Sequence, residues 1–180
     1  LITGKVTGGK DRCAGGRMTY YYKPHGTESV GKAPNPGGDL QWYNNLLINC
    51  ASLVNWDEPG LPIRYDGNVF AGGAKPALDE PKAVVDELFD PNMKLVQKAD
   101  GWYLSMNIPL DWKNQRKRKL VTTSVLDKAI VPDQAFTNPD GSRLKVDTDY
   151  LGNKRNGNPY PGALEIKKTG YQEWKVWPRN

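Results

Sequence analysis

The residues best suited to chemistry lie in and just after a stretch rich in Gly and Pro, residues 8 to 38. Cleavage of a glycosidic bond needs one carboxylic acid to protonate the leaving oxygen and a second carboxylate, about 5 to 9 Å away, to act as nucleophile or to activate water. Asp39 and Glu28 are the predicted pair, with Asp11 and Asp66 in reserve. The alternative for Asp39, which follows two glycines, is a turn residue that bonds to its own backbone.

His25 is the only histidine and stands close to three consecutive tyrosines. An imidazole titrates near neutral pH, so His25 is predicted to hold a substrate hydroxyl or to assist proton transfer. A loop histidine bonded to a backbone carbonyl is the alternative. The chain shows no compelling order of Ser, His and Asp and no Cys and His pair, which argues against a nucleophilic hydrolase.

A sugar presents apolar C–H faces and hydroxyl edges, which suit aromatic platforms beside Arg, Asn and Asp. The predicted platforms are Tyr20, Tyr21, Tyr22, Trp42 and Trp56, of which Tyr21 and Trp42 are equally compatible with core positions. Arginines can bind a uronic-acid carboxylate in bidentate fashion. The candidates for that role are Arg12, Arg17 and Arg64. For Trp102, Trp174 and Trp177, which lie in alternating patterns, we expect core positions instead.

The composition predicts many turns and short strands with few long helices. The 180 residues include 19 Gly and 14 Pro, and the aromatic residues are 9 Tyr and 6 Trp against 3 Phe. Hydrophobic residues make up 38% and recur in short clusters, which favours a folded chain. We therefore expect an all-β protein.

The net charge of +5 includes one dense basic run, residues 113 to 119, which reads KNQRKRK. No phosphate-binding loop or nucleic-acid motif accompanies this run, so we predict a solvated loop and no nucleic-acid partner. No apolar run is long enough to span a bilayer.

Metal and cofactor sites are not predicted. Cys13 and Cys50 are far apart in sequence, and a single histidine leaves no structural zinc set. The two cysteines are equally compatible with a disulfide and with two buried thiols. Asp147 and Asp149 alternate, but the other ligands of a calcium loop are lacking.

A repeat near residues 43 to 70 indicates a solenoid. The segments Tyr43–Ile48 and Tyr65–Phe70 each place an Asn directly before a short apolar strand, and Asn45 and Asn68 are 23 positions apart. An Asn at a coil corner can bond to the Asn of the next coil. Ile2–Val6 is expected to be an earlier coil, with residues 8 to 38 as an excursion from it.

The second half shows a different pattern. Residues 77 to 92 are predicted to be a linker with at most one or two helical turns around Lys82–Leu88. Alternating runs in Met93–Lys98 and Trp102–Ile108 then flank Asp100-Gly101, a strong hairpin signal. Further short strands are predicted at 120–123, 129–131, 143–146, 164–166 and 174–177. The predicted domains are residues 1–76, with the coils, and 93–180, an antiparallel β-sandwich-like domain.

A resemblance to known proteins is carried by several short segments. They are Lys23–Glu28, Gly37–Asp39, Tyr43–Leu46, Gly67–Phe70, Gly73–Pro76, Asp100–Leu104 and Asp147–Tyr150. With them the chain resembles the C-terminal portion of bacterial right-handed parallel β-helix proteins of glycan breakdown, including β-helical glycoside hydrolases. The resemblance implies the last coils of such a helix followed by a sandwich-like cap. It also implies a secreted or periplasmic protein whose earlier coils lie upstream.

Three functions follow as hypotheses. The first is part of a secreted glycoside hydrolase that acts on a polysaccharide or oligosaccharide by carboxylate acid/base chemistry. The second is a noncatalytic carbohydrate-binding or solenoid-capping domain. The third is a polysaccharide lyase, for which Lys10, Lys23 or Arg17 would serve as base. The positive charge of the excursion is compatible with an acidic glycan.

Overall fold

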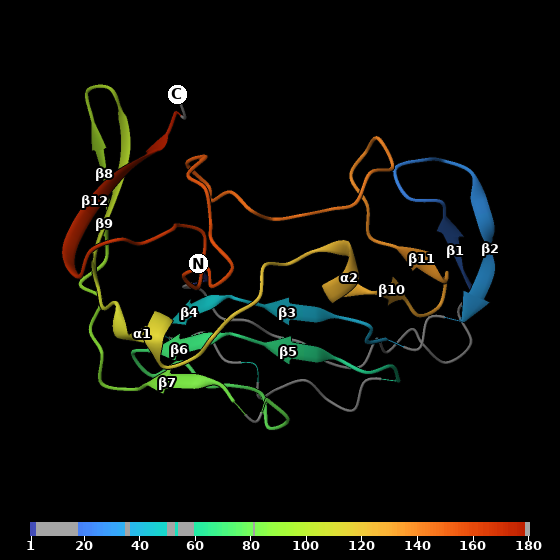
Figure 1. Ribbon diagram of the computed structural model, residues 1–180, viewed down its shortest axis with the longest axis horizontal. Coiled ribbons are helices and arrows are strands. Elements are labelled where there is room, and N and C mark those ends of the chain that lie inside the picture. Colours follow the sequence, from blue (N-terminus) through green and yellow to red (C-terminus); the bar gives the residue numbers. More distant parts are fainter. Residues whose placement is uncertain (3–17, 35–36, 50–52, 54–59, 81, 179–180) are drawn as a thin grey trace.

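The computed structural model describes residues 1–2, 18–34, 37–49, 53, 60–80 and 82–178 (Figure 1). Their regular structure is almost entirely β, and the two helices, α1 (Asp111–Asn114) and α2 (Thr123–Leu126), have four residues each. The predicted all-β class is therefore confirmed. No helix in these ranges is long and apolar enough to cross a membrane.

Short parallel strands stack at the centre of the molecule. Strand β3 (Gln41–Tyr43) pairs with β5 (Arg64–Asp66). Strand β4 (Leu46–Ile48) pairs with β6 (Val69–Ala71), and β6 pairs in turn with β7 (Val84–Asp86). Leu46 lies opposite Val69, so the repeat seen in the sequence is the register of the ladder. Ile2 forms a parallel bridge with Leu47 on the other side of β4.

The asparagines at the corners connect successive strands, as the sequence predicts. The backbone N–H and the Nδ2 of Asn45 both donate to Oδ1 of Asn68, at 2.9 and 3.0 Å. Asn68 is fully buried, and its Nδ2 donates to the Trp42 carbonyl at 2.8 Å and to Oε1 of Glu80 at 2.9 Å. Buried polar groups need such partners, so this network fixes the register of the stack.

Within the predicted linker, a strand forms where at most one or two helical turns were expected around Lys82–Leu88. Val84–Asp86 forms β7, and Val84 pairs with Val69 and is buried. On the side of β6 that faces away from β4, the backbone N–H and C=O groups need partners, and a strand supplies them. The adjacent β-branched residues Val84 and Val85 favour an extended strand over a helical turn.

The predicted hairpin around Asp100-Gly101 is confirmed. Strands β8 (Lys94–Lys98) and β9 (Gly101–Ile108) are antiparallel, and β12 (Gly170–Trp177) completes a sheet in the order β12-β9-β8. Trp174 packs against the core, but Trp102 is 37% and Trp177 62% exposed. The core prediction is wrong for these two because they pair with each other at the end of the sheet that projects away from the parallel strands (Figure 1).

Several short strands predicted after residue 120 are absent from the described part of the chain. Residues 123–126 form α2, while the segments 120–123 and 143–146 contribute only isolated bridges such as Thr122 to Lys145. Residues 164–166 form no strand. Strand β10 (Lys128–Ala129) pairs with β11 (Gln134–Ala135) in a two-residue ladder. Frequent Gly, Pro and Asn in this region interrupt any longer ladder.

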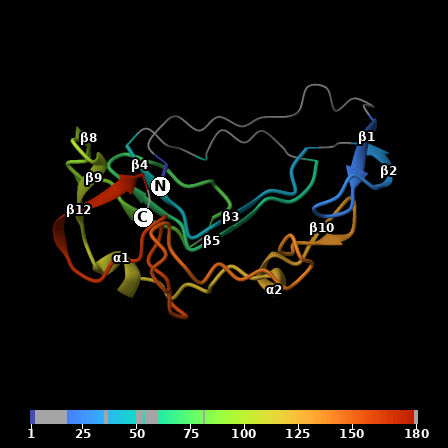
Figure 2. The same ribbon diagram turned by 90° about the horizontal axis from the view of Figure 1, so that it is seen from above.

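The described part of the excursion, residues 18–34, forms a hairpin. Strands β1 (Met18–Tyr22) and β2 (Ser29–Pro34) pair antiparallel. This hairpin is largely exposed and lies at the opposite end of the molecule from β8, β9 and β12 (Figures 1 and 2).

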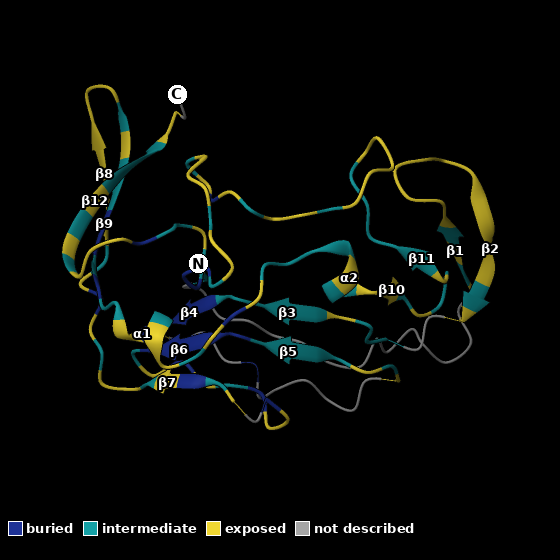
Figure 3. Cartoon of the chain, in the orientation of Figure 1, coloured by how far each residue is buried: buried dark blue, intermediate teal, exposed yellow. Residues whose placement is uncertain are grey.

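Two buried clusters lie on the two faces of the parallel strands, because successive side chains of a strand alternate. Leu47 and Phe70 belong to one cluster. Leu46, Ile48 and Val69 belong to the other, which also contains side chains from outside the parallel stack: Met106, Ile108, Trp112, Tyr160 and Ile166. Figure 3 shows the buried strands β4 and β6 at this junction. One core therefore joins the parallel strands to β9 and to the segments around Trp112 and Tyr160.

Candidate functional site

A cleft of about 430 Å³ lies between the corner of the parallel strands and the segment 146–163. We call it the polar cleft. Its lining comprises Leu1, Tyr43, Asn44, Asn45, Val121, Val146, Thr148, Asp149, Tyr150, Arg155, Pro159, Gly162 and Ala163. The lining thus combines amides, a carboxylate and a guanidinium with tyrosines and small apolar groups.

One wall of the polar cleft is the corner between β3 and β4. Asn44 has a φ of 56°, a left-handed conformation that Asn tolerates better than most residues. Its Nδ2 donates to the Lys119 carbonyl at 2.8 Å. Its own carbonyl accepts from the Gly162 N–H at 2.7 Å, so the two walls of the cleft are hydrogen-bonded to each other.

Asp149 on the opposite wall is held in one position by four hydrogen bonds. Its Oδ1 accepts from the N–H groups of Leu151 and Asn153 at 2.9 and 2.8 Å. Its Oδ2 accepts from Asn153 Nδ2 at 3.0 Å and from the Glu165 N–H at 2.9 Å. Burial acts to raise the pKa of Asp149, but these donors outweigh it and leave the pKa below its usual value. The carboxylate is therefore ionised and oriented before any ligand arrives.

Arg155 shapes the same wall. Its Nη1 and Nη2 donate to the carbonyls of Tyr160 and Gly162, at 3.1 and 2.7 Å. Burial lowers the pKa of this guanidinium, against the opposing charges of Glu165 and Asp149. Because an arginine stays charged across the physiological range, the segment 155–162 is held around a permanent cation.

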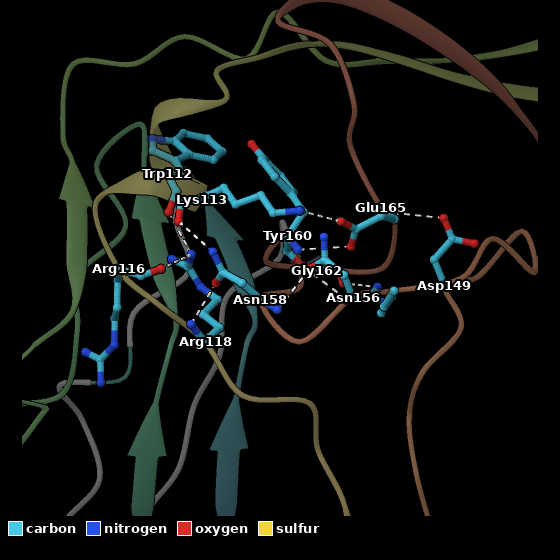
Figure 4. Close-up of polar contacts among 11 residues, drawn as sticks. Trp112, Lys113, Arg116, Arg118, Asp149, Asn156, Asn158, Tyr160, Gly162 and Glu165 are labelled. Carbon is cyan, nitrogen blue, oxygen red and sulfur yellow. Dashed lines mark hydrogen bonds and ion pairs between the residues drawn. The ribbon is translucent and has the colours of Figure 1, made fainter.

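Beneath this wall, Glu165 has both carboxylate oxygens engaged. Lys113 Nζ lies 2.7 Å from Oε1, and the Tyr160 N–H donates to Oε2 at 3.0 Å. Figure 4 shows Glu165 between Lys113 and Tyr160 on one side and Asp149 on the other.

The basic run is solvated only in part: Asn114, Gln115, Lys117 and Lys119 are exposed, as predicted, but Arg118 is only 3% exposed. Its Nε donates to the Gly67 carbonyl at 2.7 Å. Its Nη1 donates to the Trp112 carbonyl, also at 2.7 Å (Figure 4). Burial lowers the pKa of Arg118 to about 10. Arg116 pairs with Asp66, one of the reserve carboxylates. The run therefore anchors the chain to the parallel strands.

Asp39 and His25 reach the same stretch of chain from two different loops. Asp39 Oδ2 accepts from the Ile130 N–H at 2.7 Å, and Asp39 has a φ of 55°. His25 Nε2 bonds to the Thr137 carbonyl at 2.8 Å. The structure therefore brings both residues to the two ends of segment 130–137. The contact of His25 with a backbone carbonyl is the alternative predicted for it.

The other predicted site residues are more scattered. Glu28 forms an exposed ion pair with Lys23 at 2.7 Å. Arg64 Nη1 donates to the Leu126 carbonyl at 3.3 Å. Trp42 packs partly buried against the second core cluster. Tyr22, at the end of β1, is 51% exposed. Arg12, Arg17, Asp11, Lys10, Cys13, Cys50 and Trp56 lie outside the described residues.

Sequence reasoning missed Glu80. It is 5% exposed, accepts from Asn68, and has its pKa raised above the usual value by burial. Asp149 and Arg155 were likewise not predicted from the sequence to bind a sugar. Their only local signal is a run of polar residues between Asp147 and Asn158, which also describes an ordinary turn. In the described part of the chain, no group of three or more His, Cys, Asp or Glu side chains is placed to hold a metal ion.

No protein-family model and no curated protein sequence matches the chain. A solved structure described as the complex of XylC with xylose does match, with a TM-score of 0.79 and 28% sequence identity. The match covers 98% of this chain and 32% of the XylC chain, so the present chain spans about a third of that protein.

Proposed function

We propose that this chain is part of a carbohydrate-active protein and that it binds a sugar in the polar cleft. The observation that carries the proposal is the similarity, over 98% of the chain, to a structure of XylC in complex with xylose. At 28% identity and a TM-score of 0.79, the likeness extends beyond a shared strand arrangement to the sequence itself.

The geometry of the cleft supports the proposal. Small-molecule sites in proteins commonly measure about 300 to 1,000 Å³ and combine apolar lining with a few fixed polar groups. The polar cleft, at about 430 Å³, has that size, and the four hydrogen bonds on Asp149 fix one such group. Tyr43 and Tyr150 supply aromatic carbon surface for the apolar face of a sugar ring.

A xylose titration followed by amide NMR tests this proposal. We expect saturable shifts at the amides of Asp149, Tyr150 and Ala163, with smaller changes at β1 and β2. Shifts distributed evenly over the surface, or none at millimolar xylose, would count against sugar binding in the cleft.

The finer proposal is part of a secreted glycoside hydrolase whose parallel strands are the last coils of a right-handed β-helix. Support comes from the 23-residue register of β4 on β6 and from the asparagine contact between them. In this proposal Asp39 and Glu28 act as the carboxylate pair and His25 assists. Asp39 and His25 each bond to a backbone group of segment 130–137, at its opposite ends.

Asp39→Asn is the variant that tests this chemistry. The amide oxygen can still accept from Ile130 N–H, and Asn tolerates the φ of 55°, so stability should change little. If Asp39 reacts, turnover should fall by several orders of magnitude. Asp39→Ala is the structural control, since it loses the hydrogen bond as well as the charge. Unchanged turnover in Asp39→Asn would remove Asp39 from the mechanism.

A noncatalytic sugar-binding domain is the second candidate. The observation that favours it is that Asp39 and Glu28 each already hold a structural partner, Ile130 and Lys23 respectively. Xylose binding by a chain that lacks all turnover on xylose-containing oligosaccharides would select this candidate.

A further inference from the structure

A second hollow, of about 380 Å³, carries an excess of positive charge. We call it the lysine groove. Its polar lining consists of Lys113, Lys154, Lys167, Asn114, Asn156 and Glu165. Three lysines and one carboxylate residue therefore line the lysine groove.

That carboxylate neutralises only one of the three. Glu165 is bound by Lys113 at 2.7 Å and by the Tyr160 N–H at 3.0 Å, and its side chain is 5% exposed. Lys154 is 75% exposed and lies 3.4 Å from Asp147, a carboxylate that it shares with Lys145 at 3.6 Å. Lys167 is exposed as well. The groove thus has two exposed lysines, Lys154 and Lys167, beside a carboxylate that already has its partners.

The geometry points to the carboxylate of an acidic sugar as the ligand of the lysine groove. Ammonium groups attract a carboxylate as point charges, and the amides of Asn114 and Asn156 add donors and acceptors for hydroxyl groups. A uronic acid carries both kinds of group on one ring. This inference rests on the proposed function, because it names the acidic component of the same glycan.

The lysine groove and the polar cleft have no lining residue in common, but one hydrogen bond links their walls. Glu165 lines the groove with its side chain, and its backbone N–H donates to Asp149 of the polar cleft at 2.9 Å (Figure 4). The segment that carries Asp149 and Glu165 therefore contributes to the walls of both hollows.

The test compares sodium glucuronate with glucose, which has the same ring but no carboxylate, by amide NMR titration at low salt. Glucuronate should bind about five- to tenfold more tightly than glucose, with shifts at Lys154, Asn156 and Lys167. Raising the ionic strength from about 0.01 to 0.15 M should remove most of that preference, because the screening length falls from about 30 to 8 Å.

The double variant Lys154→Gln/Lys167→Gln should bind glucuronate no better than glucose. Lys82→Gln/Lys117→Gln removes the same charge from exposed positions outside the groove and should keep the preference. Equal binding of glucuronate and glucose by the wild type, or a preference that survives in the groove variant, would overturn the inference. Inorganic phosphate that shifts the same amides with equal affinity would show a general anion site and overturn the sugar assignment.

Xylose separates this inference from the proposed function. The groove variant should still bind xylose in the polar cleft. If xylose fails to bind the wild type while glucuronate binds the groove, the polar cleft proposal fails and the lysine groove stands.

Discussion

Arg118→Met tests how strongly the basic run is built into the fold. The arginine makes two short hydrogen bonds, at 2.7 Å, to the carbonyls of Gly67 and Trp112. Methionine keeps much of the volume but donates to neither carbonyl. Both acceptors would lose a charged donor in a buried position, which is the costly way to remove a hydrogen bond.

The expected loss is about 3 kcal/mol in the free energy of unfolding. Each hydrogen bond from a charged group contributes roughly 1.5 to 3 kcal/mol. The desolvation of the guanidinium, whose burial lowers the pKa of Arg118 to about 10, offsets part of that sum. A loss of this size is a large share of the 5 to 15 kcal/mol that typically stabilises a domain.

Urea unfolding followed by tryptophan fluorescence measures this loss. With a slope of about 2 kcal/mol per molar urea, the midpoint should fall by about 1.5 M. Lys117→Met is the matched control, because Lys117 is exposed in the same run, and its effect should stay within about 0.5 kcal/mol. Arg118→Lys should recover only part of the loss, since one ammonium does not reproduce the planar fork. A midpoint for Arg118→Met equal to that of Lys117→Met would refute this role of Arg118.

Three further perturbations have definite signs. Burial raises the pKa of Glu80 in the folded state, so ionisation of Glu80 lowers the stability of the protein once the pH exceeds the pKa of this residue in the unfolded chain. Glu80→Gln should therefore be more stable than wild type at about pH 7. The difference in free energy of unfolding, measured by denaturant titration, should shrink toward about pH 4. The pKa of Asp149 is lowered in the folded state, so its ionised carboxylate stabilises the protein above the pKa of this residue in the unfolded chain, and this stabilisation is lost in acid. The free energy of unfolding of Asp149→Asn should be about 2 kcal/mol below that of wild type at about pH 7, with a smaller difference in acid. Gly101→Ala would place its Cβ 2.1 Å from the Trp177 carbonyl oxygen and should lower the free energy of unfolding, measured by thermal unfolding, by about 2 kcal/mol or more. In Gly170→Ala no atom would lie within 4 Å of the added Cβ, so the loss should be only about 1 kcal/mol.

The predictions from local patterns were confirmed where one physical cause dominates. The repeat of Asn45 and Asn68 sets the register of β4 on β6, because a buried amide must find partners in the neighbouring strand. Asp100-Gly101 marks the hairpin because Gly101 has a φ of 150°. The hairpin signal is local in sequence, and the asparagine signal is a repeat with a spacing of 23 residues.

Predictions that depend on distant contacts were wrong. The run that contains Arg118 looks solvated in sequence, yet carbonyls at Gly67 and Trp112 recruit the guanidinium into the core. Val84–Asp86 becomes a strand because β6 offers an edge. The polar cleft has the same origin: Asn44 and Gly162 lie far apart in the chain and meet only in the folded molecule. The catalytic roles of Asp39, Glu28 and His25 stay predictions.

The most direct test of the central claim is xylose affinity after the polar cleft is filled. Ala163 lines the cleft from an exposed position, and its contact with Tyr150 is made by its backbone carbonyl, at 2.8 Å. Ala163→Trp should therefore fold normally while its indole occupies the cleft. Gly157→Trp is the control, because Gly157 is exposed, has no atom within 4 Å of an added Cβ and lies outside the lining. We predict that Ala163→Trp binds xylose with at least tenfold lower affinity than wild type, whereas Gly157→Trp binds xylose like wild type. Equal xylose affinity in all three proteins would contradict xylose binding in the polar cleft.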